Sequence, residues 1–305
     1  MVITVERLVK DLELEVLSEG EEGVQIKTSD INRPGLQFAG YYDYFANDRI
    51  QIIGKAEWSF LETMQTEVIK KRMKKFFQFE APCIILARGL EPHREFVENA
   101  RLNKRWVLRS QTLTTEIITK FKNYLDRELA PETRLHGVLV DVYGIGILIT
   151  GESGIGKSET ALELIKRGHR LVADDAVDIK EIDGNLFGTA PYITSGMMEV
   201  RGMGIIDVPA LYGLSSILKE KIIDFVIYLE QWKSEQNYDR LGIDEEYVNI
   251  LDMPVKKIVV PIRPGRNIAV IIEAAAANYR YSKMSKVSPV ETIEKRMEEI
   301  FNNAK

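Results

Sequence analysis

Eight consecutive residues have the types and spacing of a phosphate-binding loop. They read Gly151-Glu152-Ser153-Gly154-Ile155-Gly156-Lys157-Ser158, so two glycines are separated by four residues and followed by lysine and serine. Glycine lets successive backbone N–H groups point at phosphate oxygens, because no Cβ blocks the approach. Lys157 would place its charge on the β- and γ-phosphates, and Ser158 would offer a hydroxyl to Mg²⁺. The pattern therefore predicts nucleotide binding rather than a glycine-rich turn that binds nothing.

Such a loop works only between a strand and a helix, and the sequence indicates both. Residues 147–150 are apolar and mostly β-branched, and residues 159–166 are rich in helix formers. A further apolar segment, 170–173, leads to Asp174-Asp175. Paired acids at a strand end can supply a magnesium ligand or a base, although they can also be loop residues or a helix cap. The phosphate loop just upstream favours the functional interpretation.

A second dense stretch is Glu199-Val200-Arg201-Gly202-Met203-Gly204-Ile205-Ile206-Asp207-Val208. One glutamate, one arginine and two glycines around an apolar run would suit a metal-binding turn that enters a strand. The residues alone do not decide between that interpretation and a structural turn.

Composition narrows the class of protein. The 305 residues allow two domains, and a net charge of −5 argues against a nucleic-acid binder. We therefore interpret the basic run at 70–75 as a solvated helix face. Cys83 is the only cysteine and there are three histidines, which excludes an intramolecular disulfide and a cysteine zinc cluster and disfavours a histidine metal cage. No apolar run approaches the roughly 20 residues that span a bilayer. The first residues are acidic where a signal peptide would be basic, so we expect a cytoplasmic protein.

The order of expected elements predicts two α/β domains. Strands alternating with helices indicate a small α/β domain over residues 1–130, and a helix over 114–129 ends at the boundary to a second domain, 131–305.

Five local expectations can be checked against a structure. We expect a first helix capped by Thr4, a turn at 30–35, one helix running from about Ser59 to Met73, a hairpin at Asp183-Gly184, and a strand at 269–272. The aromatic residues at 41–45 are interpreted as core or subunit contact.

The stretch 199–208 matches the signature of the bifunctional HPr kinase/phosphorylases, enzymes that phosphorylate a serine of the phosphocarrier protein HPr. The first domain resembles that family at 32–36 and 50–54, so the resemblance covers nearly the whole chain. It also rests on the spacing of His136, the phosphate loop, Asp174-Asp175, Arg240 and Pro261-Ile262-Arg263-Pro264-Gly265-Arg266.

The resemblance implies a fold and an activity. The fold is a small α/β amino-terminal domain for regulation or assembly, followed by a P-loop kinase domain that resembles the phosphoenolpyruvate carboxykinase-like nucleotide-binding core. The activity is phosphorylation of HPr by ATP or pyrophosphate with Mg²⁺, and the reverse phosphorolysis of phosphoseryl-HPr by inorganic phosphate. Such a protein would regulate carbon metabolism, bind HPr and a neighbouring subunit of a homohexamer, and need neither nucleic acid nor a membrane.

The resemblance also implies residue roles. Gly151–Ser158 would bind the nucleotide phosphates, with Lys157 catalytic, and Ser158 and Glu199 would hold the magnesium. Asp175 would be the base toward the HPr serine and, when protonated, the acid of the reverse reaction. His136 would help to set the proton affinity of Asp175, although a lone histidine before a strand is often structural. Arg240 would stabilise the transferring phosphoryl group. The signature and dephosphorylation residues would be Arg201, Gly202, Gly204, Asp207, Pro261, Arg263, Pro264, Gly265 and Arg266.

Three rival functions share the phosphate loop. A GTPase should also carry an Asn-Lys-x-Asp motif, and the sequence has none. A small-molecule kinase or carboxykinase-like enzyme would need its own metal and substrate histidines and lysines, whereas only His169 follows the loop. A nucleotide-gated regulatory module would tolerate loss of Asp175, whereas a phosphoryl-transfer enzyme would not.

Overall fold

The computed structural model describes residues 3–232, 246–263, 265–284, 292–293, 295–297 and 299–300. The chain divides into two compact units, Met1–Ala130 and Pro131–Lys305, which we describe one at a time. In the described ranges, none of the helices combines the length and the apolar character needed to cross a membrane.

The first unit is built on a five-stranded sheet in the order β2-β7-β6-β5-β4. Strands β4 to β7 run parallel and β2 is antiparallel to β7, while β1 and β3 form a separate short ribbon. The elements are β1 (Ile3–Thr4), α1 (Val5–Leu12), β2 (Glu15–Ser18), β3 (Gln25–Ile26), β4 (Ile31–Asn32), α2 (Gly35–Ala39), β5 (Ile50–Ile53), α3 (Lys55–Glu62), α4 (Thr66–Phe76), β6 (Ile84–Leu86), α5 (Arg94–Leu102), β7 (Val107–Arg109) and α6 (Thr114–Leu129).

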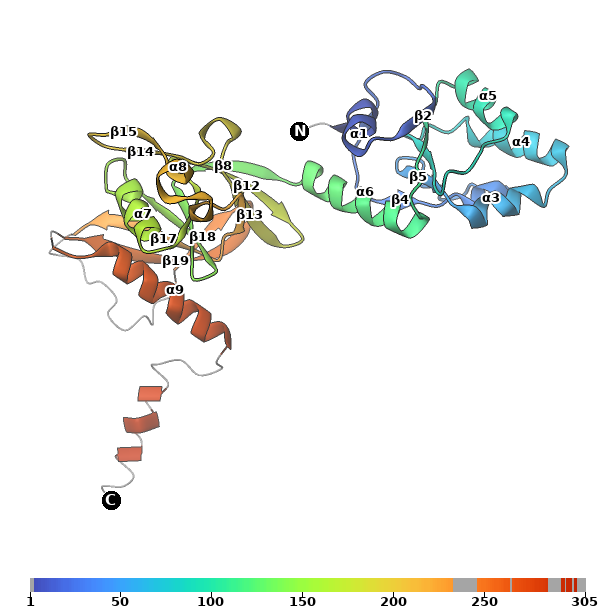
Figure 1. The fold of residues 1–305 in the computed structure, drawn as a ribbon. Helices are drawn as coiled ribbons and strands as arrows, with labels where there is room; N and C mark the ends of the chain where they lie inside the picture. The colour runs from blue at the N-terminus through green and yellow to red at the C-terminus, as the bar shows by residue number, and fades with distance from the viewer. Residues whose placement is uncertain are drawn as a thin grey trace. The chain divides into compact units, whose positions relative to one another are not determined.

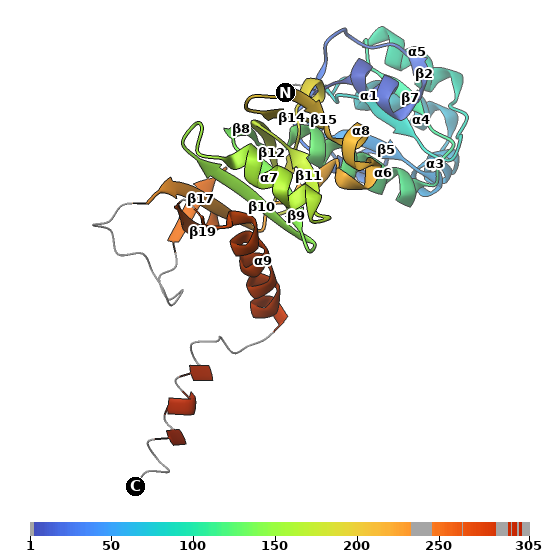
Figure 2. The same cartoon turned by 60° about the vertical axis from the view of Figure 1, so that its left-hand side comes forward.

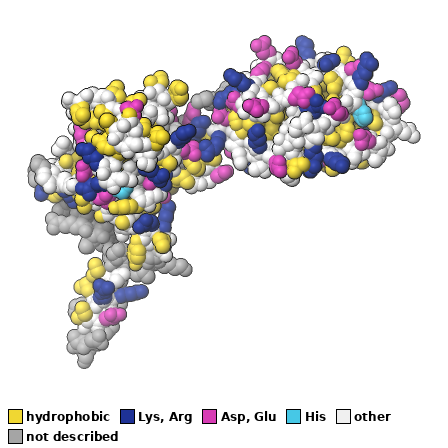
Figure 3. Space-filling view, viewed as in Figure 1, with side chains coloured by type: hydrophobic (Ala, Val, Ile, Leu, Met, Phe, Trp, Pro, Cys, Tyr) yellow, Lys and Arg dark blue, Asp and Glu magenta, His cyan; other side chains and the backbone are white. Residues whose placement is uncertain are grey.

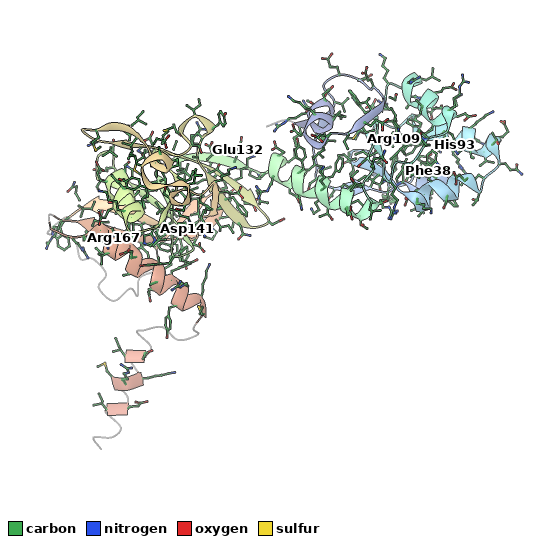
Figure 4. All side chains as sticks on the ribbon, viewed as in Figure 1. Phe38, His93, Arg109, Glu132, Asp141 and Arg167 are labelled. Carbon is green, nitrogen blue, oxygen red and sulfur yellow. The ribbon has the colours of Figure 1, made fainter. Side chains whose placement is uncertain are left out.

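Helices cover both faces of this sheet (Figure 1). Alternate residues of each strand point to opposite faces, so Ile52 and Ile85 join a core with α1 and α6, whereas Ile53 and Leu86 join a second core with α2 to α5. Phe38, labelled in Figure 4, is fully buried in that second core. The expected small α/β domain is confirmed as a fold.

Local structure in this unit confirms one expectation fully and corrects two. Thr4 caps α1 by accepting a hydrogen bond from the Arg7 N–H at 3.4 Å. The single helix predicted through Ser59 to Met73 is wrong, because the chain leaves the helix after Glu62, is extended at Gln65 and begins a new helix at Thr66. The turn predicted at 30–35 is also wrong in part, because parallel pairing with β5 makes a strand of Ile31–Asn32.

Side-chain exposure tests two further expectations. The lysines of the basic run at 70–75 are exposed on α4, which confirms a solvated helix face. Among the aromatic residues at 41–45, Tyr42 and Phe45 lie against each other with ring centres 5.9 Å apart, whereas Tyr41 and Tyr44 are exposed. Half of that aromatic cluster therefore belongs to the core.

The second unit has three layers. A six-stranded sheet, β11-β9-β10-β17-β19-β18, lies between helices and a four-stranded antiparallel sheet, β16-β13-β12-β8, and the hairpin β14–β15 is separate. The elements are β8 (Glu132–His136), β9 (Val138–Val142), β10 (Ile145–Gly151), α7 (Lys157–Lys166), β11 (Arg170–Ala173), β12 (Ala176–Ile182), β13 (Asn185–Thr189), η1 (Tyr192–Thr194), β14 (Met197–Val200), β15 (Gly204–Asp207), α8 (Val208–Tyr212), η2 (Leu214–Ser216), β16 (Glu220–Ile222), β17 (Phe225–Gln231), β18 (Glu246–Ile250), β19 (Met253–Ile262) and α9 (Ile268–Met284).

Side chains of the central strands of this unit pack into two hydrophobic cores, one on each face of the sheet. Ile147 and Ile227 pack under α7 and α9, whereas Leu148 and Val226 pack against the second sheet. Strands β10, β17 and β19 run parallel, so their carboxyl ends meet at one edge of the sheet. Figure 2 shows α7 beside these strands from a second direction.

Two expectations for this unit have opposite outcomes. The hairpin at Asp183-Gly184 is confirmed, because β12 and β13 pair from Ile182 and Asn185 outward. The strand predicted at 269–272 is wrong, because these residues lie in the first turns of α9. Ala269, Ile272 and Ala276 are buried at spacings of three and four residues, which is the periodicity of a helix face.

Candidate functional site

The phosphate loop lies between a strand and a helix, as its sequence predicts. Strand β10 ends at Gly151 and α7 begins at Lys157. Gly151 and Gly156 have φ values of +142° and +100°, which side chains other than glycine rarely adopt. A Cβ on Gly151 would also lie 2.4 Å from the backbone oxygen of Leu229, so glycine is required there.

Lys157 is folded back over the loop that precedes it. Its Nζ donates hydrogen bonds of 3.0 Å to the backbone oxygens of Gly151 and Glu152, and the residue is only 7% exposed. A buried ammonium held by two backbone oxygens costs little to redirect toward an anion, since a phosphate would offer it charged acceptors.

Asp174 ties three segments together. Its Oδ1 accepts a hydrogen bond of 2.8 Å from the Ser158 hydroxyl, and its Oδ2 accepts one of 3.0 Å from the Glu199 N–H. The residue is 4% exposed, and this burial raises the pKa of its carboxyl above the ordinary value. Asp174 therefore links the start of α7 to the hairpin that carries Glu199, a role that its sequence position did not disclose.

Asp175 faces outward from the same turn. Its Oδ1 lies 3.1 Å from Nδ1 of His136, and both side chains are more than half exposed. Two backbone contacts fix the position of this pair. Ala176 is paired with His136 across β12 and β8, and the Gly137 N–H donates to the backbone carbonyl oxygen of Asp175 at 3.0 Å. Asp175 has a φ of +66°, a conformation that aspartate tolerates better than most side chains.

A cavity of about 160 Å³ brings most of these groups together. Four segments contribute to it: the end of β8 with the start of β9, the phosphate loop with the start of α7, the turn after β11, and the hairpin β14–β15. Its lining residues are His136, Val138, Ser153, Gly154, Gly156, Lys157, Ser158, Glu159, Asp174, Asp175, Glu199 and Arg201. A larger hollow of about 520 Å³ in the first unit, beside Trp106, has no comparable set, so chemistry and not size identifies the site.

The other signature residues have structural contacts in the hairpin β14–β15 and at its junction with α8. Gly202 and Gly204 have positive φ values of +83° and +88° at its tip, and the Asp207 carboxylate caps α8 by accepting from the Ala210 N–H at 2.8 Å. Arg201 lies so close to Gly154 that a Cβ there would be 2.6 Å from its Nη1. Neither the tip glycines nor Asp207 lines the cavity.

The described dephosphorylation residues, Pro261, Arg263, Gly265 and Arg266, lie at or just after the carboxyl end of β19 and do not line the cavity. The Arg263 guanidinium carbon is 3.2 Å from the ring centre of Trp232, and Arg266 donates from Nη1 to the Pro261 oxygen at 3.2 Å. Gly265 has a φ of +83°. Arg240 and Pro264 lie outside the described residues.

Sequence reasoning missed Glu230 and Trp232 at this edge. Glu230 follows a run of apolar residues in β17, just as Asp174 follows β11, and this shared pattern could have drawn attention to it. Its Oε1 is buried and accepts no hydrogen bond from the part of the protein that the structure describes.

The donor groups in the cavity suit magnesium better than zinc. Within the described ranges, no three or more His, Cys, Asp or Glu side chains come together as a metal cage. Ser158, Asp174 and Glu199 instead present oxygen donors beside a phosphate loop. Magnesium usually takes one or two carboxylates and completes its shell with phosphate oxygens and water.

Two family descriptions and many named relatives match this chain. "HPr Serine kinase N terminus" matches residues 3–125, and "HPr Serine kinase C-terminal domain" matches residues 127–297. An HPr kinase/phosphorylase of Clostridium novyi is 74% identical over 99% of both chains, and one of Clostridium acetobutylicum is 67% identical over 99% of both. A solved structure, the Hpr(Ser) kinase/phosphatase from Coxiella burnetii, is 37% identical, with a TM-score of 0.48 over 50% of this chain and 93% of the other.

Proposed function

Because this chain belongs to the HPr kinase/phosphorylase family, we propose that it transfers a phosphoryl group from ATP or pyrophosphate to a serine of HPr. We propose also that it runs the reverse reaction, in which inorganic phosphate removes that group as pyrophosphate, and that it thereby regulates carbon metabolism in the cytoplasm. One observation carries the proposal: the 160 Å³ cavity in which the phosphate loop, Asp175 and Glu199 converge.

The phosphate loop holds the donor. Its backbone N–H groups and the start of α7 bind the phosphates, and Lys157 moves from its two backbone oxygens onto the transferring group. Arg201, which lies against Gly154, is the second cation at the cavity. Two cations beside the reacting group favour the negative charge that phosphoryl transfer places there.

Asp175 is the proposed base. An exposed carboxylate can reach a serine hydroxyl that a protein substrate presents, and His136 holds it in place through the 3.1 Å contact. In the reverse direction the same carboxyl, now protonated, returns the proton to the leaving seryl oxygen. Asp174 cannot replace it, because both of its oxygens already accept hydrogen bonds.

Magnesium fits the donor set at the loop. Ser158 and Glu199 are the proposed ligands, since both line the cavity and Ser158 lies in the first turn of α7, directly after the phosphate-loop lysine. When bound, the ion would neutralise phosphate charge and orient the donor.

An exposed apolar surface beside the cavity supports a protein as the acceptor. We call this surface the apolar rim; its residues lie in the hairpin β14–β15, in α8 and in the short elements η1 and η2. Figure 3 shows hydrophobic side chains gathered over that part of the unit. Its members are Tyr192, Ile193, Met203, Ile205, Leu211 and Leu214. Ile205 is paired with Glu199 across the hairpin, so the rim is continuous with the cavity. Exposed apolar patches of this kind mark protein contact sites.

We propose that the chain self-associates as a homohexamer, that the first unit serves regulation or assembly, and that the second unit is catalytic. Supporting this division, every described residue of the cavity belongs to the second unit. Light scattering of the purified full chain measures the mass directly, and a monomeric mass would contradict the assembly but not the chemistry.

Mass spectrometry tests the proposed reaction. HPr is incubated with the full chain and MgATP, and then with excess inorganic phosphate. We expect one serine to gain a phosphoryl group and then to lose it with release of pyrophosphate, and Asp175→Asn to abolish both stages. Unmodified HPr after the first stage would refute the proposal. Phosphorylation of HPr that inorganic phosphate does not reverse would contradict the proposed phosphorolysis alone.

A further inference from the structure

The carboxyl edge of β17 and β19 presents several side chains on one face. Glu230 is paired with Pro261 and Gln231 with Ile262. The backbone N–H of Trp232 continues this ladder by donating to the backbone oxygen of Ile262 at 3.2 Å. Ile227 and Leu229 point into the core under α7. Because side chains alternate along a strand, Glu230 and Trp232 point together to the opposite face.

Trp232 holds the side chain of Arg263 at this edge. The guanidinium carbon lies 3.2 Å from the ring centre, which is a close cation–π contact. A guanidinium that stacks through its flat face keeps its N–H donors at the rim of the plane. Those donors remain able to bind a planar or tetrahedral anion.

Glu230 is the competing partner for that guanidinium. With neighbouring strands about 4.8 Å apart and a rise of about 3.3 Å per residue, residues 230 and 263 are separated by about 8 Å at Cα, within the combined reach of two long side chains. The buried Glu230 Oε1 accepts no hydrogen bond from the described residues, so an arginine donor would satisfy it. A guanidinium paired with Glu230 would lose much of its positive charge toward any other anion.

The same edge adjoins the phosphate loop. Leu229 of β17 is paired with Gly151, the first residue of that loop. Arg263 thus lies two strands from the loop, on the side away from β9. Inorganic phosphate has no nucleoside to anchor it, so a nearby cation contributes a larger share of its binding than of ATP binding.

We propose that Trp232 is a positioning residue for phosphorolysis: it holds the Arg263 guanidinium away from Glu230, so that Arg263 binds inorganic phosphate. The inference rests on the proposed function and adds to it a phosphate-binding group and the residue that keeps this group available. Loss of the aromatic ring releases Arg263 to Glu230 and weakens phosphate binding, and removal of the Glu230 charge reverses that effect.

Four variants of the full chain test the inference: Trp232→Leu, Trp232→Phe, Glu230→Gln and the double change Trp232→Leu with Glu230→Gln. KM for inorganic phosphate is measured in the phosphorolysis of phosphoseryl-HPr, and KM for MgATP in the forward reaction. Trp232→Leu should raise the phosphate KM about tenfold, with much smaller changes in kcat and in the MgATP KM. Trp232→Phe should stay within about threefold of the unchanged protein, because the ring face remains.

The double variant decides between positioning and simple loss of packing. In the Trp232→Leu background, Glu230→Gln should reverse at least half of the rise in the KM for inorganic phosphate, measured on a logarithmic scale. A purely structural role for Trp232 predicts no such reversal. An unchanged phosphate KM in Trp232→Leu overturns the inference. So does an equal loss in both reaction directions, a Trp232→Phe variant as impaired as Trp232→Leu, or a double variant no better than Trp232→Leu. If the unchanged protein fails to phosphorylate HPr, the proposed function fails separately, and calorimetric titration of the same variants with inorganic phosphate still tests the inference.

Discussion

Asp174 and Asp175 are adjacent and chemically identical, yet the same substitution should affect them in opposite ways. Asp174→Asn replaces a carboxylate that accepts from Ser158 and from the Glu199 N–H by an amide with one acceptor oxygen. The amide NH₂ group then faces a donor. Asp175→Asn leaves an exposed side chain exposed and keeps a residue type that tolerates its φ of +66°.

The magnitudes follow from the two environments. A hydrogen bond to a charged group contributes about 1.5–3 kcal/mol, but a neutral amide regains part of the cost of burying a charge at Asp174, so we expect a net loss of about 1–2 kcal/mol. Asp175→Asn should change stability by less than about 0.5 kcal/mol, as exposed substitutions usually do. Its effect should instead be on catalysis, with a loss of about 10²- to 10⁴-fold in both directions.

Amide hydrogen exchange at Glu199 measures the first effect directly, because that N–H is a donor to Asp174. A loss of about 1–2 kcal/mol corresponds to about 5- to 30-fold faster exchange in Asp174→Asn. Phosphorylation and phosphorolysis of HPr measure the second effect in Asp175→Asn. The reasoning is refuted if Glu199 exchanges at its original rate in Asp174→Asn, or if Asp175→Asn retains more than a tenth of either activity.

Three further predictions concern stability, pH and the acceptor. A Cβ on Gly146 would lie 1.9 Å from the backbone oxygen of Ile222 in β16. Gly146→Ala should therefore destabilise the second unit by about 1–3 kcal/mol or more, which thermal unfolding would show as a lower midpoint temperature. Burial acts to raise the pKa of Asp141, but the Lys221 ammonium and the neighbouring backbone N–H outweigh it, so the pKa lies below the ordinary 3.8. The ionised Asp141 carboxylate therefore stabilises the folded protein above pH about 4, and this contribution is lost as the pH falls through the folded-state pKa of Asp141. In Asp141→Asn, a plot of the free energy of unfolding against pH should be flatter in this range. An unchanged slope would contradict this prediction. Leu214→Ser in the apolar rim should raise the KM for HPr about fivefold or more, whereas Leu102→Ser, equally exposed at 82% on the first unit, should not; equal effects would argue against the rim as a contact site.

The parts of the fold that could be predicted have strong local determinants. The phosphate loop has a strict residue pattern, and Asp183-Gly184 supplies the turn residues that a two-residue hairpin needs. The helix over 114–129 was predicted at its observed bounds, because its apolar residues recur at helical spacing and a proline follows it.

The errors come from segments whose local signal is ambiguous. Four apolar residues at 269–272 fit a strand or a buried helix equally well, and only packing against the sheet decides between them. The break between Glu62 and Thr66 leaves no glycine or proline to mark it, so one helix was expected where two exist.

The site was predictable in its residue types more than in its contacts. The loop, Asp175, His136 and Glu199 were identified from spacing and resemblance, and the structure brings them to one cavity. Their chemical roles remain predictions. The two hydrogen bonds of Asp174 and the stacking of Trp232 on Arg263 join segments far apart in the chain, and spacing carries no information on such contacts.

The Ser158–Asp174–Glu199 connection has a thermodynamic consequence. Because one carboxylate joins the first turn of α7 to the hairpin, occupancy at the phosphate loop and the local order of the hairpin form a linked equilibrium. If an anion at the loop strengthens the attachment of the hairpin by some factor, a molecule that orders the hairpin strengthens binding of that anion by the same factor. A molecule that docks beside Glu199 and orders the hairpin would then also raise the affinity of the phosphate loop for its anion, without touching it.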